Sequence, residues 1–190
     1  MLLRRFVFVC FMALAFLARQ SGAVDLENTI YLELKDGRVT IEMRPDLAPN
    51  HVARIKELVR QEFYDGVVFH RVIEDFMAQT GDVEFGNFTN DKFDLTRAGT
   101  GGSNLPDLKA EFSNLAHEKG VVSMARSSDP NSANSQFFIC FADAPNLDRD
   151  YTAFGKVIEG MEFVDKIKRG NGSSGLVSDP DKIISLRSVQ

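Results

Sequence analysis

Residues 69–82 read FHRVIEDFMAQTGD and set one cation, Arg71, in a largely apolar stretch that ends near the amide of Gln79. In an extended chain, successive side chains alternate between two faces. The odd-numbered side chains from Arg71 to Gln79, with Ile73 and Met77 between them, are therefore predicted to share one side of a strand. A lone guanidinium beside apolar surface suits a reaction that shifts little charge and needs no nucleophile.

The hydrophobic pattern outside this run predicts a mainly β protein. Alternating apolar residues over 29–43, with a tight reversal at Asp36-Gly37, are typical of a β-hairpin. Apolar residues at helical spacing predict helices over residues 50–63 and about 161–169. The other expected strands cover residues 68–79, 120–124, 136–141, 151–157 and 182–189. Several antiparallel strands with two helices favour a closed antiparallel barrel whose ends the helices cap.

The N-terminus has the layout of a secretory signal peptide. Arg4 and Arg5 precede an uninterrupted apolar stretch over residues 6–18, and small residues follow at 21–23. We therefore predict a signal peptide over residues 1–23 and one domain over residues 24–190. The apolar stretch is short for a membrane span, although an uncleaved anchor remains the alternative. No membrane insertion is expected after cleavage.

Charge and cysteine content restrict the function of the expected mature domain. Residues 1–23 hold three arginines and no acid, so their removal changes the formal charge from −5 to −8. An acidic domain argues against nucleic acid as a partner. One cysteine remains, Cys140, and its apolar neighbours favour a buried side chain over a reactive thiol. The histidines lack metal-ligand spacing, so no metal is expected.

Three blocks of the sequence resemble the cyclophilins, the cyclosporin-type peptidyl-prolyl cis-trans isomerases. They are residues 69–82, SANSQFFIC at residues 132–140 and FGKV at residues 154–157. The resemblance spans about residues 29–189. It implies a closed eight-stranded antiparallel barrel capped by two α-helices, rotation of X-Pro peptide bonds without a cofactor, and unfolded or partly folded proline-containing polypeptides as substrates. We expect a monomer.

The resemblance also assigns roles to individual residues. It implies that Arg71 and Gln79 are catalytic, and that Gln79 and Gln136 hydrogen-bond the peptide backbone. The Gly99–Gly102 turn is expected to lie beside the groove, within an irregular stretch over residues 83–106. Substrate-binding positions are expected at Phe76, Met77, Ala125, Arg126, Gln136, Phe138, Leu147 and Tyr151.

Taken one at a time, these residues also permit structural interpretations. Arg71 could pair with Glu74 or Asp75 on a surface strand, and each aromatic residue could belong to an ordinary core. A peptide strand pairing with the backbone of Arg126 would be a form of strand addition.

Two single residues and one dipeptide depart from the usual family pattern. Asn146 stands where many members carry a tryptophan that helps bind cyclosporin, and the chain has no tryptophan. We therefore expect weak cyclosporin binding, with a micromolar or weaker inhibition constant. Tyr151 stands where many members have a histidine, and its ring can still pack against proline. Arg149-Asp150 replaces a turn that usually contains glycine.

These observations favour an exported isomerase that assists the folding of other exported proteins, most simply in a periplasm. An endomembrane lumen and the extracellular space are the alternative compartments. A non-catalytic module that binds proline-containing segments is the second functional hypothesis. A secreted β-barrel hydrolase is the third, although no nucleophile-elbow motif is present.

Overall fold

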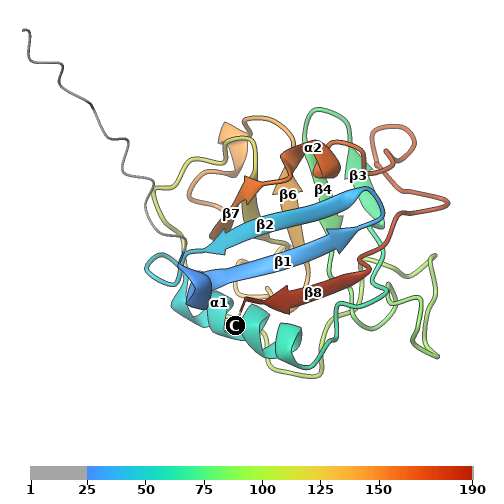
Figure 1. Ribbon diagram of the computed structural model, residues 1–190, viewed down its shortest axis with the longest axis horizontal. Helices are drawn as coiled ribbons and strands as arrows, with labels where there is room; N and C mark the ends of the chain where they lie inside the picture. Colours follow the sequence, from blue (N-terminus) through green and yellow to red (C-terminus); the bar gives the residue numbers. More distant parts are fainter. Residues whose placement is uncertain (1–24, 190) are drawn as a thin grey trace, which may run out of the picture.

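Eight antiparallel strands form one strongly curved sheet in the computed structural model, which describes residues 25–189 (Figure 1). The strand order across the sheet is β3-β4-β6-β5-β7-β2-β1-β8. The strands are β1 (Thr29–Leu34), β2 (Gly37–Met43), β3 (Arg71–Ile73), β4 (Met77–Thr80), β5 (Val121–Met124), β6 (Phe137–Cys140), β7 (Ala153–Glu159) and β8 (Ser185–Ser188). The predicted signal peptide lies outside the described residues.

The sheet is an open half-barrel, so the prediction of a closed barrel is wrong. Its two edge strands, β3 and β8, form no ladder with each other. The edge of β3 is already occupied, because Val72 donates to the carbonyl of Gly175 and accepts from the amide of Gly170. Between the two edges, single bridges such as Val68 to Lys182 take the place of a continuous ladder.

The region predicted as one strand over residues 68–79 is a hairpin of β3 and β4. The chain reverses at Glu74 and Asp75, and Asp75 adopts a left-handed conformation with φ 56°. The hairpin places Arg71 opposite Gln79, and Ile73 opposite Met77. These side chains therefore share a face as predicted, but through pairing across the hairpin instead of alternation along one strand.

Two α-helices are present within residues 25–189, and both end earlier than predicted. Helix α1 (Pro49–Arg60) begins with a proline in its first turn and stops before Glu62, which has a left-handed φ of 58°. Helix α2 (Met161–Val164) covers one turn. The chain beyond α2 leaves helical geometry because the amides of Lys168 and Gly170 donate to Asp181 and Val72 instead. Neither helix is long and apolar enough to cross a membrane.

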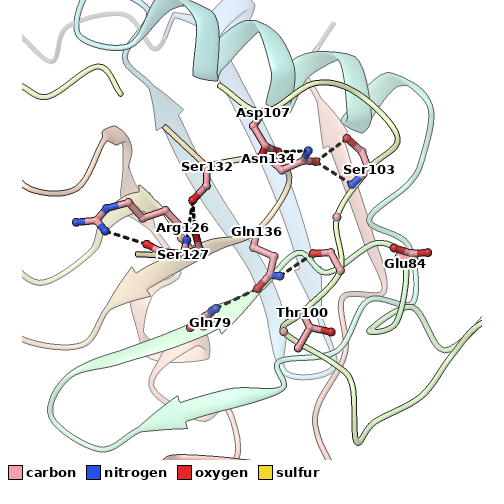
Figure 2. A pocket seen from close by; sticks show the side chains of 14 residues that line it. Gln79, Glu84, Thr100, Ser103, Asp107, Arg126, Ser127, Ser132, Asn134 and Gln136 are labelled. Carbon is pink, nitrogen blue, oxygen red and sulfur yellow. Dashed lines mark hydrogen bonds between the residues drawn. The ribbon is translucent and has the colours of Figure 1, made fainter. Parts of the chain in front are cut away.

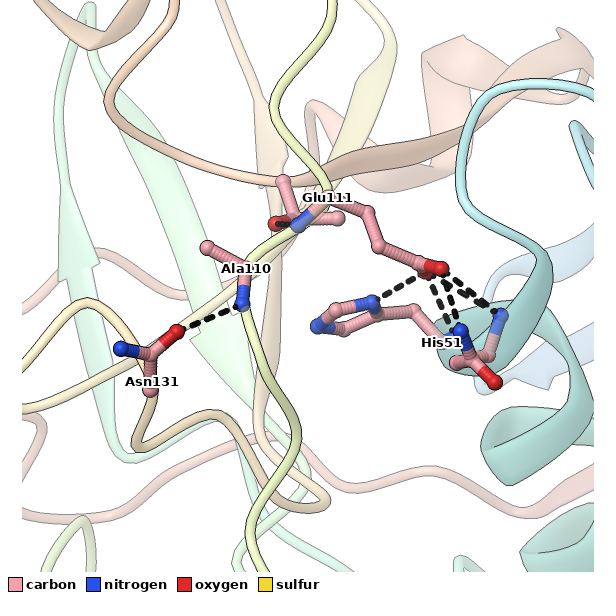
Figure 3. Close-up of polar contacts among 6 residues, drawn as sticks. His51, Ala110, Glu111 and Asn131 are labelled. Carbon is pink, nitrogen blue, oxygen red and sulfur yellow. Dashed lines mark hydrogen bonds and ion pairs between the residues drawn. The ribbon is translucent and has the colours of Figure 1, made fainter.

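A carboxylate from a distant loop caps the N-terminus of α1 (Figure 3). Ala48, at the N-cap position of α1, has no side chain that could cap the first amides. Glu111 instead accepts from the backbone amides of Asn50 and His51, and from His51 Nδ1 at 2.6 Å. Charge-assisted bonds of this kind satisfy the free amides of a helix start and complement its dipole.

Two apolar clusters divide the interior. The larger one joins the sheet to α1 and includes the fully buried Leu32, Ile41, Ile55, Leu58 and Phe154. The smaller one contains Met77, Phe138, Cys140, Ala144 and Leu147. Cys140 is buried, as predicted, and burial raises the pKa of its thiol to about 12, which favours the unreactive neutral form.

Candidate active site

A chain of amide hydrogen bonds connects Arg71 to the neighbouring strands. Arg71 Nη1 donates to Gln79 Oε1 at 3.3 Å, and Gln79 Nε2 donates to Gln136 Oε1 at 3.0 Å. Gln136 Nε2 in turn donates to the carbonyl of Gly101 at 2.8 Å, so the chain ends at the predicted glycine turn (Figure 2). In this chain, each glutamine side chain accepts a hydrogen bond through Oε1 and donates one through Nε2.

No acid neutralises Arg71 within residues 25–189. It also donates from Nε to the carbonyl oxygen of Ser174 at 3.0 Å, and from Nη1 to Met77 Sδ at 3.9 Å. Glu74, the carboxylate expected as a possible partner, instead pairs with Arg169 at 2.7 Å. The interpretation of Arg71 as half of a surface ion pair is therefore wrong. The guanidinium keeps its full charge and lies beside Met77 in a half-buried position.

A hollow of about 270 Å³ adjoins the guanidinium; it has polar walls and an apolar base, after which it is here called the apolar hollow. Its base consists of Met77, Phe138 and Leu147, each at most 6% exposed. The ring of Phe138 meets Tyr151 edge to face, with centroids 5.8 Å apart. The residues that line the hollow are Arg71, Phe76, Met77, Gln79, Ala125, Arg126, Phe138, Asn146, Leu147 and Tyr151.

The structure thus brings together all the predicted site residues except Gln136 in one hollow. Gln136 lines a second, larger hollow of about 640 Å³, which shares Gln79, Ala125 and Arg126 with the first. The two hollows meet at these shared residues, so an extended peptide could occupy both. Asn146, which the sequence analysis noted only as a departure from the family, also lines the apolar hollow.

Arg126 covers one wall of the apolar hollow. Its guanidinium lies 4.5 Å from the centre of the Tyr151 ring and pairs with Asp150 at 2.9 Å. The side chain also donates to the carbonyls of Ser127 and Asp150. The backbone amide and carbonyl of Arg126 make no hydrogen bond within the described residues, so both remain available to a peptide strand.

Two residues that the sequence did not identify as site residues shape the second hollow: Asn134 lines it, and Asp82 holds the glycine turn that lines it. The buried Asp82 accepts hydrogen bonds from the amides of Gly99 and Gly101 at 2.7 and 2.9 Å. Asn134 accepts from Ser103 and donates to Asp107 at 2.9 Å (Figure 2). Asp82 is the last residue of the motif at residues 69–82, and Asn134 lies within SANSQFFIC. Their positions in these motifs could have identified them as site residues.

A polar chain lies behind the apolar hollow. Asp148 accepts from His117 Nδ1 at 3.0 Å, and His117 Nε2 lies 3.1 Å from Ser123 Oγ. The His117 ring also stacks on Phe138. The order Asp-His-Ser matches that of a hydrolytic triad, but Ser123 is fully buried and no substrate can reach its hydroxyl. The hydrolase hypothesis therefore has no support from this constellation.

Comparison with known proteins gives a consistent result. Residues 29–188 match the family described as cyclophilin type peptidyl-prolyl cis-trans isomerase/CLD. A probable peptidyl-prolyl cis-trans isomerase of Brucella suis is 60% identical over 179 residues, which is 90% of this chain and 91% of that protein. A peptidyl-prolyl cis-trans isomerase of Acinetobacter baylyi is 40% identical over 85% of this chain and 86% of its own length.

Solved structures show the same resemblance. A cyclophilin from Hirschia baltica superposes with a TM-score of 0.72 and 29% identity, covering 87% of this chain and 75% of that chain. A cyclophilin-type isomerase of Cryptosporidium parvum, solved in the presence of the dipeptide Ala-Pro, gives a TM-score of 0.72 and 25% identity, covering 85% of this chain and 99% of that chain. With the family match and these relatives, the chain belongs to the cyclophilin-type peptidyl-prolyl cis-trans isomerases.

Proposed function

We propose that this isomerase accelerates X-Pro rotation in exported proteins and that Arg71 provides the main stabilisation of the twisted bond. The observation that supports this role most directly is the position of Arg71. Its guanidinium, which pairs with no acid within residues 25–189, borders a hollow of about 270 Å³ whose apolar base leaves room for a proline ring. With a proline ring on the apolar base of the hollow, the prolyl nitrogen would lie next to the Arg71 guanidinium.

The energy required is small enough for binding alone to supply it. Amide resonance sets a barrier of ~18–20 kcal/mol, and uncatalysed X-Pro rotation takes tens to hundreds of seconds. Reaching an ordinary turnover of ~10–10³ s⁻¹ requires about three to five decades of acceleration, or about 4–7 kcal/mol. Tighter binding of the twisted bond than of either planar form provides this without a covalent intermediate.

Each group of the site has a distinct part in this mechanism. The proline ring packs on Met77 and Phe138 in the apolar hollow. As the bond twists, the prolyl nitrogen loses conjugation, and its lone pair accepts a hydrogen bond from Arg71. Partial burial of the guanidinium above the apolar base of the hollow strengthens this bond. Gln79 orients the guanidinium, and together with Gln136 it offers amide groups to the peptide backbone.

The proposed substrates are proline-containing segments of unfolded or partly folded polypeptides. The Cryptosporidium parvum relative was solved in the presence of Ala-Pro, which supports peptides with proline as the substrate class. The free backbone groups of Arg126 support binding in an extended conformation. Slow X-Pro isomerisation limits the folding of many chains, so an isomerase of this kind would assist folding.

Replacement of Arg71 tests the mechanism. We expect Arg71→Ala to lower kcat/KM for a short X-Pro peptide by about 10²–10³-fold, the usual effect of removing one donor to the transition state. Arg60→Ala, at an exposed position at the end of α1, is the control and should leave the rate unchanged. Equal rates for Arg71→Ala and the native chain would remove Arg71 from the mechanism. Absence of acceleration by either protein would favour the non-catalytic binding module.

The proposed compartment is a periplasm, with export directed by residues 1–23. The charged start and apolar stretch of these residues support this proposal. The full chain should appear in the periplasmic fraction of a Gram-negative host, with a mass that corresponds to loss of the first 23 residues. A chain without residues 1–23 should stay in the cytoplasm. An uncut chain in the membrane fraction would instead support the anchor alternative.

A further inference from the structure

The segment Gly170–Val177, here called the rim loop, pairs with the edge of the sheet beside the active site. Val72 N donates to Gly175 O at 2.7 Å, and Gly170 N donates to Val72 O at 2.9 Å. Val177 N adds a bond of 3.1 Å to the carbonyl of His70. The rim loop therefore bonds to the backbone of His70 and Val72, the residues immediately before and after Arg71.

The rim loop also contacts the guanidinium itself. The carbonyl oxygen of Ser174 accepts from Arg71 Nε at 3.0 Å, while Gln79 accepts from Nη1. The guanidinium is therefore held at two of its nitrogens, and Nη2 makes no hydrogen bond within residues 25–189. A guanidinium carries five N–H donors in a rigid plane, so two bonds at different nitrogens define its orientation. Both acceptors are neutral and leave its charge uncompensated.

The position of the Ser174 carbonyl depends on the backbone of Gly175. This residue has φ +69°, and a Cβ built on it would lie 2.4 Å from Ile73 Cγ1 and 3.0 Å from Val72 O. A side chain at this position would therefore push the rim loop away from β3. Gly172, at the other end of the same turn, has φ +60° but would place its Cβ in open space. The two glycines share one backbone conformation and differ in their surroundings.

We propose that the rim loop is a positioning element for catalysis, which holds Arg71 in its reactive orientation through the Ser174 carbonyl. The proposal rests on the role of Arg71 given above. Fixed orientation matters because misplacement of a catalytic group by about 1 Å can lower a rate by about 10²-fold. The rim loop supplies this orientation without the neutralisation that a carboxylate partner would cause.

Alanine substitution at the two glycines separates positioning from backbone strain. We expect Gly175→Ala to lower kcat for an X-Pro peptide at least about tenfold, with little change in KM, because substrate binding in the hollows is retained. Gly172→Ala introduces a similar left-handed strain without the clash and should stay within about twofold of the native chain. Thermal unfolding and circular dichroism of each protein check that the fold is retained.

A double-mutant cycle tests whether the effect passes through Arg71. In an Arg71→Ala background, Gly175→Ala should cause no further loss of rate, since contacting residues are strongly coupled. Equal kcat values for Gly175→Ala and Gly172→Ala would overturn the proposal. So would a full Gly175→Ala effect that persists without Arg71.

An NMR measurement separates this proposal from the role of Arg71 in catalysis. The Nε–H signal of Arg71, assigned by its loss in Arg71→Lys, should exchange slowly with water in the native chain and in Gly172→Ala. It should exchange rapidly in Gly175→Ala. Slow exchange in the native chain together with unchanged activity of Arg71→Ala would contradict the catalytic role and leave the positioning contact established. Rapid exchange in the native chain would overturn the positioning contact itself.

Discussion

Arg71 combines full charge with a defined orientation because all its hydrogen-bond acceptors are neutral. Gln79 Oε1 and the Ser174 carbonyl oxygen accept hydrogen bonds from its guanidinium, whereas Glu74 forms an ion pair with Arg169. A carboxylate partner would have occupied donors that the twisted bond needs. The positive charge of Arg71 therefore remains free to interact with the substrate. Interaction with a preorganised charge or dipole is the usual source of transition-state stabilisation in an enzyme.

Asn146 offers a test of inhibitor recognition at the scale of one residue. It is exposed and lines the apolar hollow beside Leu147. The native chain should bind cyclosporin with a micromolar or weaker inhibition constant. Asn146→Trp adds a large apolar surface to the wall of the hollow, and we expect at least about tenfold tighter inhibition, or about 1.4 kcal/mol.

A matched variant controls for the cyclosporin experiment. Glu162→Trp adds the same side chain at an exposed position on α2 that lines neither hollow, and it should leave inhibition unchanged. Isomerase activity measured in parallel confirms that the hollow remains intact. Nanomolar inhibition of the native chain would refute the prediction that Asn146 weakens binding.

Among the elements, the sequence predicted strands better than the connections between them. Arg71 and Phe138 both line the hollow, as the resemblance implied, because each lies within a short motif that can be matched residue by residue. The reversal at Asp75 was missed, since no glycine or proline marks it. The roles of Asp82 and Asn134 were missed because each bonds to loop residues far along the chain, and a local pattern does not show such pairs.

The cap of α1 is a second feature that no local pattern shows, and it gives a prediction about stability. Glu111→Gln removes the negative charge at the helix start, where two backbone amides and His51 donate to the carboxylate. We expect the free energy of unfolding at pH 7 to fall by about 1–2 kcal/mol, in the range of a lost helix cap. Urea denaturation measures this change.

Glu118→Gln is the control for the helix cap. Glu118 is exposed, and its one ion pair within residues 25–189 is with Lys156 at 3.3 Å, so its loss should change stability by less than about 0.5 kcal/mol. Equal effects of the two substitutions would show that the contact at α1 contributes no more than a surface ion pair.

At the scale of the whole molecule, the half-barrel has a site at one of its open edges. The edge strand β3 carries Arg71, and the rim loop covers that edge in place of a further strand. The rim loop uses both backbone groups of Val72 on this edge, and it brings the Ser174 carbonyl beside the guanidinium. The sequence did not predict that the sheet would be open at β3. This open edge allows the rim loop to reach the site.

The stability of the whole domain should depend on pH through its buried histidines. His70 is 3% exposed, and neither ring nitrogen has a hydrogen-bond partner within the described residues. Burial lowers the pKa of His70 from 6.5 to about 4, although nearby Asp82 opposes the shift. Burial also lowers the pKa of His51, against the opposing effect of Glu111.

Between about pH 6.5 and pH 4, the unfolded chain binds a proton at His70 and the folded chain does not, so the free energy of unfolding falls as pH falls. At ~1.36 kcal/mol per pH unit, His70 should contribute a loss of about 2 kcal/mol between pH 7.5 and pH 5. Urea denaturation at both values measures the total loss, to which His51 adds in the same direction. In His70→Gln the loss should be smaller by about that amount, whatever the absolute stability of the variant. The same pH dependence in both proteins would show that His70 is protonated equally in the folded and unfolded chains.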